Sequence, residues 1–291
     1  MKGLKIFYYH LISETEKDYY PHQSTITTKV FEEQIKYYSN RYEIITINEA
    51  YKRFQSGSKL DKQLVITTDD GFSENYTNVC PILEKYKAKG SFFLIENSID
   101  NKMMMWRHIL FILRAKVDNT TLYEEVKSLS KEFEIIAPEK DVDMLKWSYR
   151  QFPNKSKDNI CKSLWNRIMP MSVEEYLANN STYLTSEQIK EMLQNGHTIG
   201  SHSKTHPNTE LLNVEELDFE VNKSLKRLEE KFETKVISFA FPFGANERAS
   251  KIISKEFPDV KVQLGIMKKL NSNTNSPIKW ERLNMETSSF K

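Results

Sequence analysis

The sequence has few cysteines and no long apolar run. Its 291 residues include two cysteines, Cys80 and Cys161, which lie far apart in the chain. Two cysteines are too few for a disulfide framework, so two reduced and mostly buried thiols are expected. No stretch reaches the roughly 18 apolar residues of a membrane span, and the N-terminal apolar run is too short for a signal peptide. These absences predict a cytoplasmic protein without a transmembrane span.

An excess of charge of one sign is also missing. The chain has 42 basic and 40 acidic residues, which give a formal net charge of +2. Nothing in that balance favours a nucleic acid as partner. Hydrophobic residues make up 39% and aromatic residues 12% of the chain, so a sizeable core can form in one large domain or two small ones.

Short apolar segments alternate with helical patterns along most of the chain. Strands are expected at residues 4–9, 43–47, 64–67, 91–95, 197–200, 236–241, 260–266 and 278–285. Helices are expected between them, with caps at Thr27 or Thr28, at Thr185 and at Asn213. This alternation predicts a parallel sheet, and enough units are present to close a barrel.

Residues 101–185 interrupt the alternation. The segment contains helical stretches and no clear strand, and it holds three of the four tryptophans, Trp106, Trp147 and Trp165. We interpret it as a helical insertion within a single domain that spans residues 1–291. Its aromatic residues most simply form the core of a small helical subdomain. The alternative is that they line a lid or groove for a glycan or a lipid-linked sugar.

Two adjacent carboxylates, Asp69 and Asp70, follow the strand at 64–67 and precede a glycine. A turn explains an isolated Asp-Asp-Gly, because Asp and Gly favour turns. A divalent cation is the alternative, since it makes paired carboxylates electrostatically favourable. That alternative requires further ligands elsewhere in the chain.

A histidine pair provides those ligands. His202 and His206 follow the strand at 197–200 in the sequence HTIGSHSKTHP. Parallel topology brings the carboxyl ends of strands together, so Asp70, His202 and His206 would form a site of two histidines and one carboxylate. Such a site leaves positions open for water and substrate, as a catalytic metal requires.

The motifs taken together resemble those of the polysaccharide deacetylases, the NodB-homology or family 4 carbohydrate esterases. TTDDG is similar to the family's first motif, T-F-D-D-G, with Thr68 in place of Phe. HSKTH fits the second motif, and FAFPFG resembles the third, F-R-x-P-Y-G, with Ala240 in place of Arg. The resemblance covers nearly the whole chain apart from the insertion. It implies an α/β fold, a distorted (β/α) barrel of about seven strands.

The resemblance also implies roles for the motif residues. Asp70, His202 and His206 would hold a divalent metal, zinc first and Ni²⁺, Co²⁺ or Fe²⁺ as alternatives. Asp69 would be the general base that takes a proton from the attacking water. The main-chain N–H of Phe243 would stabilise the tetrahedral oxyanion.

The sequence departs from the family pattern at two positions. The usual proton donor is a late histidine, but no histidine follows His206. A branch that makes exopolysaccharides opens with a similar Tyr-His and uses that histidine as general acid, which points to His10; an ordinary core histidine is the alternative. For the arginine replaced by Ala240, Arg282 in WERL is the candidate substitute, with a plain surface arginine as the alternative.

The predicted function is metal-dependent removal of an N-acetyl group from an amino sugar, in a poly- or oligosaccharide or a sugar precursor. One alternative is a deformylase that acts on a formylated amino sugar. Another is a glycan-binding pseudoenzyme, although retention of both aspartates and both histidines argues against it. The expected partner is a carbohydrate with an N-acyl amino sugar, and a lipid-linked substrate would bring the protein to a membrane surface. The sequence does not predict the oligomeric state.

Overall fold

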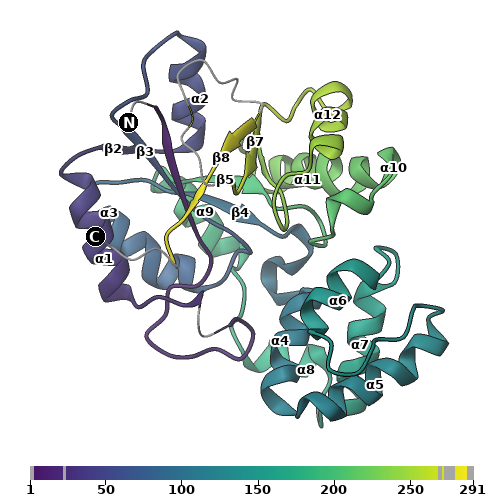
Figure 1. The fold of residues 1–291 in the computed structure, drawn as a ribbon. Coiled ribbons are helices and arrows are strands. Elements are labelled where there is room, and N and C mark those ends of the chain that lie inside the picture. Colours follow the sequence, from purple (N-terminus) through teal and green to yellow (C-terminus); the bar gives the residue numbers. More distant parts are fainter. Residues whose placement is uncertain (1–2, 22–23, 268–270, 272–278, 287–291) are drawn as a thin grey trace.

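The computed structural model describes residues 3–21, 24–267, 271 and 279–286. Its strands form one sheet in which every pairing between strands is parallel (Figure 1). The strands are β1 (Lys5–Tyr9), β2 (Glu43–Ile45), β3 (Gln63–Thr68), β4 (Ser91–Leu94), β5 (Thr198–Ser201), β6 (Ser238–Ala240), β7 (Val262–Gly265), β8 (Trp280–Glu281) and β9 (Leu283–Asn284).

The last segment of the chain closes the sheet into a barrel. The predicted strand at 278–285 is divided at Arg282 into two short strands. β8 pairs with β7, and β9 pairs with β1, so this segment joins the two edges of the sheet. The strand order is β8-β7-β6-β5-β4-β3-β1-β9, and β2 pairs with β3 beside this path. This arrangement confirms the predicted distorted (β/α) barrel.

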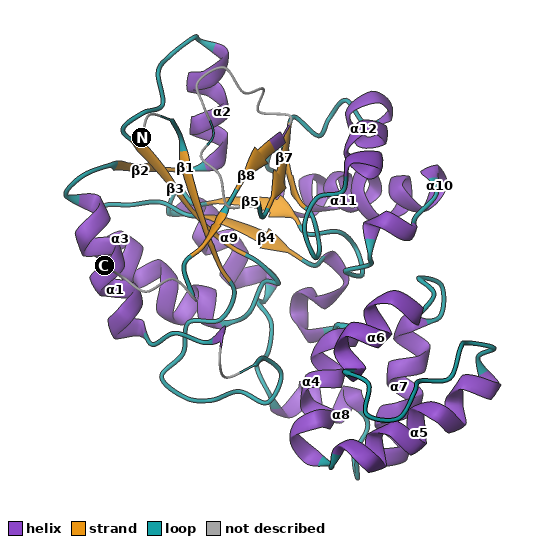
Figure 2. Cartoon of the chain, in the orientation of Figure 1, coloured by secondary structure: helices purple, strands orange, loops and turns teal. Residues whose placement is uncertain are grey.

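Helices surround the barrel (Figure 2). Most lie where the sequence pattern predicts them, but Ile47, the last residue of the strand expected at 43–47, begins a helix that ends at Gln55. The side chains of Thr27, Thr185 and Asn213 accept hydrogen bonds from the first turns of their helices, which confirms the three expected caps. The helix expected after Asn213 has a π-helical turn in its middle. These elements are α1 (Thr28–Ser39), α2 (Ile47–Gln55), η2 (Asn75–Val79), α3 (Cys80–Lys85), η3 (Glu96–Asn101), α9 (Ser186–Gln194), η4 (Thr209–Leu211), α10 (Val214–Leu217), η5 (Asp218–Asn222), α11 (Lys223–Phe232) and α12 (Glu247–Glu256).

The segment expected as an insertion folds into five helices that pack on one another beside the barrel (Figure 1). They are α4 (Trp106–Lys116), α5 (Asn119–Glu132), α6 (Met144–Gln151), α7 (Lys157–Ile168) and α8 (Val173–Asn179). Trp106, Trp147 and Trp165 are buried in one hydrophobic cluster of this helical region. The same cluster includes Phe72 and Tyr183, which form an antiparallel bridge next to the barrel end, so the helical core is continuous with the site region.

The barrel has its own apolar core. One cluster lies between the sheet and its helices, with Phe31, Ile66 and Phe239 among its fully buried members, and another includes Phe93 and Trp280. Both cysteines are buried and unpaired, as expected. No helix in the described part of the chain is long and apolar enough to cross a membrane.

Candidate metal and catalytic site

Parallel pairing brings the predicted site residues to one end of the barrel. His10 directly follows β1, Asp69 and Asp70 follow β3, and His202 follows β5. These side chains line a cavity of about 260 Å³. The complete set of predicted residues in the lining is His10, Asp69, Asp70, His202, His206 and Phe243. The seventh predicted residue, Arg282, is fully buried and contacts this set through Asp69.

Asp70, His202 and His206 form a cluster with the donor set of a divalent metal. One ligand atom from each of the three lies within 4.8 Å of the others. Asp70 Oδ1 is 3.5 Å from His202 Nε2 and 3.6 Å from His206 Nε2. This oxygen is buried and has no hydrogen-bond partner among the described residues. A buried carboxylate oxygen without a partner is costly, and a cation between the three side chains would satisfy it, so the residues fit a metal.

One histidine of the cluster is oriented by a backbone contact, and the other is neutral. His202 Nδ1–H donates to the carbonyl of Ala240 at 2.8 Å, which leaves Nε2 free to face Asp70. Metal-binding histidines commonly donate their other ring N–H to such an acceptor. Burial and the neighbouring His202 hold the pKa of His206 well below its ordinary value. His206 is therefore neutral, as a metal ligand must be.

The backbone at the site adopts a conformation that is rare for residues with side chains. Asp70, His206 and Phe243 have positive φ angles of 67°, 56° and 60°. Each such residue costs stability and persists where the surrounding structure holds it, often at functional sites. The structure therefore stores strain at a metal-cluster carboxylate, a metal-cluster histidine and the predicted oxyanion donor.

Asp69 is held by Arg282. The guanidinium donates from Nη1 to Oδ1 at 2.7 Å and from Nη2 to Oδ2 at 2.8 Å, a bidentate pair. Burial opposes the charge of Asp69, but Arg282 outweighs it and lowers the pKa of the carboxyl. Arg282 thus makes the contact expected of the arginine that Ala240 replaces, and its role in catalysis stays a prediction.

His10 is paired with Glu286. Its Nδ1 lies 3.1 Å from Glu286 Oε2, and its backbone N–H donates to the other oxygen of the same carboxylate. Burial opposes the charged imidazole, but Glu286 outweighs burial and raises the pKa of His10 to about 9. His10 is therefore protonated at neutral pH, the state that a general acid needs. No local pattern indicates Glu286 as the partner of His10, since the two residues are 276 positions apart along the chain.

A histidine of the helical region contacts the metal cluster. His108 in α4 is fully buried, and its Nε2 lies 3.3 Å from Asp70 Oδ2. Burial lowers the pKa of His108, while its hydrogen bond and neighbouring charges keep the pKa of Asp70 well below its ordinary value. The contact is therefore a hydrogen bond from a neutral imidazole to a carboxylate. The two oxygens of Asp70 therefore have different contacts. Oδ2 accepts from His108, and Oδ1 faces His202 and His206.

A chain of hydrogen bonds fixes the tautomer of His108. An ionised Asp70 only accepts, so His108 Nε2 carries the proton and Nδ1 accepts from the Tyr183 hydroxyl at 2.7 Å. That hydroxyl in turn accepts from the backbone N–H of Met105 at 3.0 Å. His108 is not among the site residues predicted from the sequence. The available signal was a histidine within an apolar helix, since a buried imidazole needs hydrogen-bond partners.

Two more side chains of the helical region support the histidine loop. Trp106 Nε1–H donates to the carbonyl of His206 at 2.9 Å. Lys157 Nζ donates to Thr205 Oγ1 at 2.7 Å, and Thr205 donates to Glu220 at 2.6 Å. The tryptophan expected in a helical core therefore also contacts the site.

The loop after β6 places Phe243 against the cluster. Its ring centroid lies 4.7 Å from that of His206. No residue in the described ranges accepts a hydrogen bond from its backbone N–H, so this donor is available to a ligand in the cavity. The assignment of Phe243 as oxyanion donor stays a prediction.

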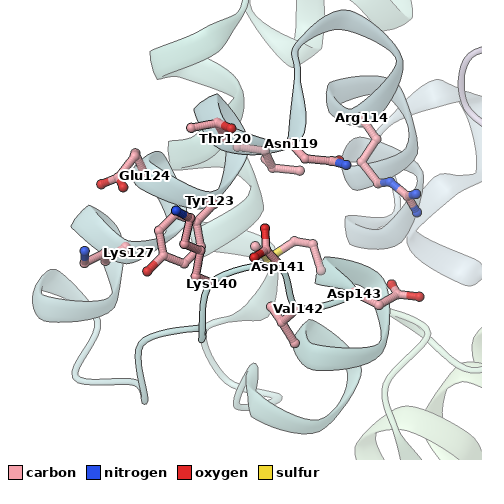
Figure 3. A pocket seen from close by; sticks show the side chains of 12 residues that line it. Arg114, Asn119, Thr120, Tyr123, Glu124, Lys127, Lys140, Asp141, Val142 and Asp143 are labelled. Atoms are coloured by element: carbon pink, nitrogen blue, oxygen red, sulfur yellow. The ribbon is translucent and has the colours of Figure 1, made fainter.

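A larger cavity, of about 560 Å³, lies away from these residues in the helical region (Figure 3). Side chains of α5 and of the segment before α6 line it, and Arg114 at the end of α4 points toward it. Its lining mixes both charges, includes no histidine or cysteine, and includes none of the predicted site residues. The predicted site residues lie at the smaller cavity at the barrel end.

Comparison with known proteins agrees with the motifs and the fold. The family model of the polysaccharide deacetylases matches residues 56–259. YxkH of Bacillus subtilis, named for the same family, is 35% identical over 101 residues, and this match spans 34% of each protein. The chain thus aligns with about a third of that relative's length.

Two solved structures share the fold over almost the whole chain. The deacetylase PplD of Streptococcus pyogenes, solved with acetate, has a TM-score of 0.62 at 17% identity, covering 97% of this chain and 92% of PplD. IcaB from Ammonifex degensii has a TM-score of 0.62 at 17% identity, covering 98% and 92%. Because the family model matches more than half of the chain, and the three motifs lie at the barrel end, this protein belongs to the polysaccharide deacetylase family.

Proposed function

We propose that this protein is a metal-dependent hydrolase that removes the N-acetyl group of an amino sugar. The observation that carries the proposal is the convergence of Asp70, His202 and His206 within 4.8 Å, next to Asp69 in the same cavity. The substrate is a poly- or oligosaccharide or a sugar precursor. Zinc is the expected metal, because two imidazoles and one carboxylate with open positions are typical of catalytic zinc sites.

The bound cation supplies Lewis acidity, which lowers the pKa of water from about 15.7 to near 7 and polarises a carbonyl oxygen. The other steps belong to the chain's own residues. Asp69 accepts the proton of the attacking water, since Arg282 keeps it ionised and correctly turned. The free N–H of Phe243 donates to the developing oxyanion.

His10 protonates the leaving amine in this proposal. An amine is a poor leaving group until it receives a proton, and His10 lines the cavity with a pKa raised to about 9. Its pairing with Glu286 keeps the proton available at neutral pH. The two acid–base groups come from the ends of β1 and β3, which are neighbours in the sheet.

The test is hydrolysis of N-acetylglucosamine oligomers by zinc-loaded protein, with released acetate measured directly. Chelation should abolish acetate release, and added zinc should restore it. The same samples are assayed for formate with N-formyl sugars, because a deformylase uses identical chemistry. If zinc-loaded, folded protein binds the sugars but releases neither acid, the protein is a glycan-binding pseudoenzyme and the proposal is wrong.

A further inference from the structure

One charged side chain of the site cavity makes no direct ion pair with any residue in the described part of the chain. Arg107, in the first turn of α4, lines the cavity beside Asp70. Its guanidinium carbon lies 5.1 Å from the ring centroid of Phe243 and 5.6 Å from that of Phe111. Its backbone N–H has a partner, Met105 Sδ, but its guanidinium has no hydrogen bond or ion pair with any residue that the structure describes.

The nearby carboxylates are engaged elsewhere. Asp143 caps α6, where it accepts from the backbone N–H groups of Leu145 and Lys146. Asp70 accepts from His108 and faces the two cluster histidines. The first turn of α4 contains no acidic residue that could offset either the guanidinium or the positive end of the helix dipole.

The remainder of the chain offers no carboxylate side chain in reserve. The segments outside the described ranges are residues 1–2, 22–23, 268–270, 272–278 and 287–291. None of them contains an aspartate or a glutamate. These segments therefore supply no carboxylate side chain that could pair with Arg107.

Two other charged pairs of the cavity are complete within the protein. Asp69 is neutralised by Arg282, and His10 by Glu286. Asp70 is the carboxylate of the proposed metal cluster. Arg107 is half-buried, and burial lowers its pKa, so water compensates its charge incompletely. A partly desolvated cation without a partner is unfavourable, and an anionic group of a ligand would remove that cost.

We infer that Arg107 forms an oxyanion subsite, and that the amino sugar carries a phosphate or carboxylate group close to its N-acyl group. A guanidinium binds either oxyanion through two parallel hydrogen bonds. The ring faces of Phe111 and Phe243 hold the guanidinium in the cavity by cation–π contact. This inference rests on the proposed function, because it specifies the substrate of the same site.

The experiment compares three sugars that share the N-acetylglucosamine ring. They are neutral N-acetylglucosamine, its 1-phosphate and N-acetylmuramic acid, which carries a carboxylate. Zinc-loaded wild type, Arg107→Gln, Arg107→Lys and Arg114→Gln are assayed for acetate release and, by calorimetry, for binding. Arg114→Gln is the matched control, since it removes the same charge from the same helix at an exposed position.

Wild type and Arg114→Gln should prefer at least one anionic sugar over the neutral one by about ten- to hundredfold in kcat/KM or in affinity. Arg107→Gln should lose that preference mainly through KM, and Arg107→Lys should keep part of it. Preference for the 1-phosphate alone would identify a sugar phosphate, and preference for the acid alone a carboxylated sugar.

Three results would overturn the inference. Wild type could bind all three sugars equally, Arg107→Gln could keep the full preference, or it could weaken all three sugars alike. Charge-dependent binding without any acetate release would contradict the hydrolase proposal and leave the subsite standing. Acetate release that does not depend on the charge of the sugar would contradict the subsite and leave the hydrolase proposal standing.

Discussion

The barrel and the helical region contribute to the site in different ways. The barrel supplies the groups expected to carry out chemistry, since Asp69, Asp70, His202 and His10 all follow its strands. The helical region supplies contacts that hold those groups, through His108 to Asp70 and Trp106 to the carbonyl of His206. The helical region therefore contributes to the site chiefly through the first turn of α4, which holds His108 and Trp106.

The largest expected effect tests the catalytic role proposed for the barrel residues. Asp69→Asn should lower kcat by about 10²–10⁴-fold, because it removes the general base and keeps the shape. The zinc content should stay at the wild-type level, since Asp69 is not in the ligand cluster. Steady-state kinetics and metal analysis of the same sample check both expectations.

The same substitution has a predicted cost in stability. Asn leaves Arg282 buried without its carboxylate, so the free energy of unfolding should fall by about 3–5 kcal/mol. Rates are therefore compared per folded molecule, with Asp259→Asn, at a surface ion pair with Lys226, as control. A rate within tenfold of wild type would assign the base to another group.

The next effect tests the helical region. His108→Gln should weaken zinc binding by about 10–100-fold, the usual consequence of removing a group that orients a metal ligand. Competition with a chromogenic chelator measures this without any assay of turnover. Tyr183→Phe should shift affinity in the same direction by less, because it removes the hydroxyl that donates to His108.

A buried histidine of the barrel is the matched control. His197 is 2% exposed, and its Nδ1 accepts from the backbone N–H of Gly90, away from the cluster. His197→Gln should reduce stability and leave zinc affinity unchanged. Equal zinc affinity in wild type and His108→Gln would show that the helical region only packs beside the site.

A smaller effect concerns pH. An acid must be protonated to act, so the rate should fall as pH rises through the His10 pKa of about 9. Glu286→Gln removes the largest contribution that raises this pKa, while burial, which lowers it, and Asp70 and Asp69, which raise it, remain. The alkaline limb of the pH–rate profile should therefore move from near 9 toward the ordinary value of 6.5, and a shift to that value would be a loss of about thirtyfold at pH 8. An unchanged limb would mean that His10 is not the acid.

The smallest effect belongs to Trp106. Trp106→Phe keeps most of the apolar volume and removes the hydrogen bond to the carbonyl of His206. The unsatisfied carbonyl should cost about 1–3 kcal/mol of unfolding free energy, with a fewfold loss of zinc affinity. Trp165→Phe, which removes a hydrogen bond to Met171 within the helical region, should lower stability alone. Equal zinc affinities in the two variants would show that the hydrogen bond of Trp106 does not support zinc binding.

The predictable parts of this protein follow from local patterns joined by topology. Alternating strands and helices predicted the barrel, and parallel pairing brought Asp70 to the two histidines. Arg282 could be named because Ala240 replaces the arginine of the third motif and Arg282 lies in the last predicted strand. In the structure this strand closes the sheet. The bidentate contact of Arg282 with Asp69 depends on that closure, which no local pattern encodes.

The unpredicted residues depend on contacts between distant segments. His108 lies in an apolar helix whose pattern indicates only burial, and its approach to Asp70 depends on how α4 packs against the barrel end. Glu286 reaches His10 because β9 pairs with β1. Neither the packing of α4 against the barrel end nor the pairing of β9 with β1 can be predicted from periodicity or spacing. These two partners are therefore found only in the three-dimensional structure.

The most direct test of the account is a crystal structure of the zinc-loaded protein with anomalous data at the zinc edge. The account predicts one strong peak about 2.0–2.2 Å from an oxygen of Asp70 and from a ring nitrogen of both His202 and His206. It also predicts that His108 contacts the other oxygen of Asp70 and stays outside bonding distance of the metal. A peak elsewhere, or three side chains that share no cation in fully loaded protein, would contradict it.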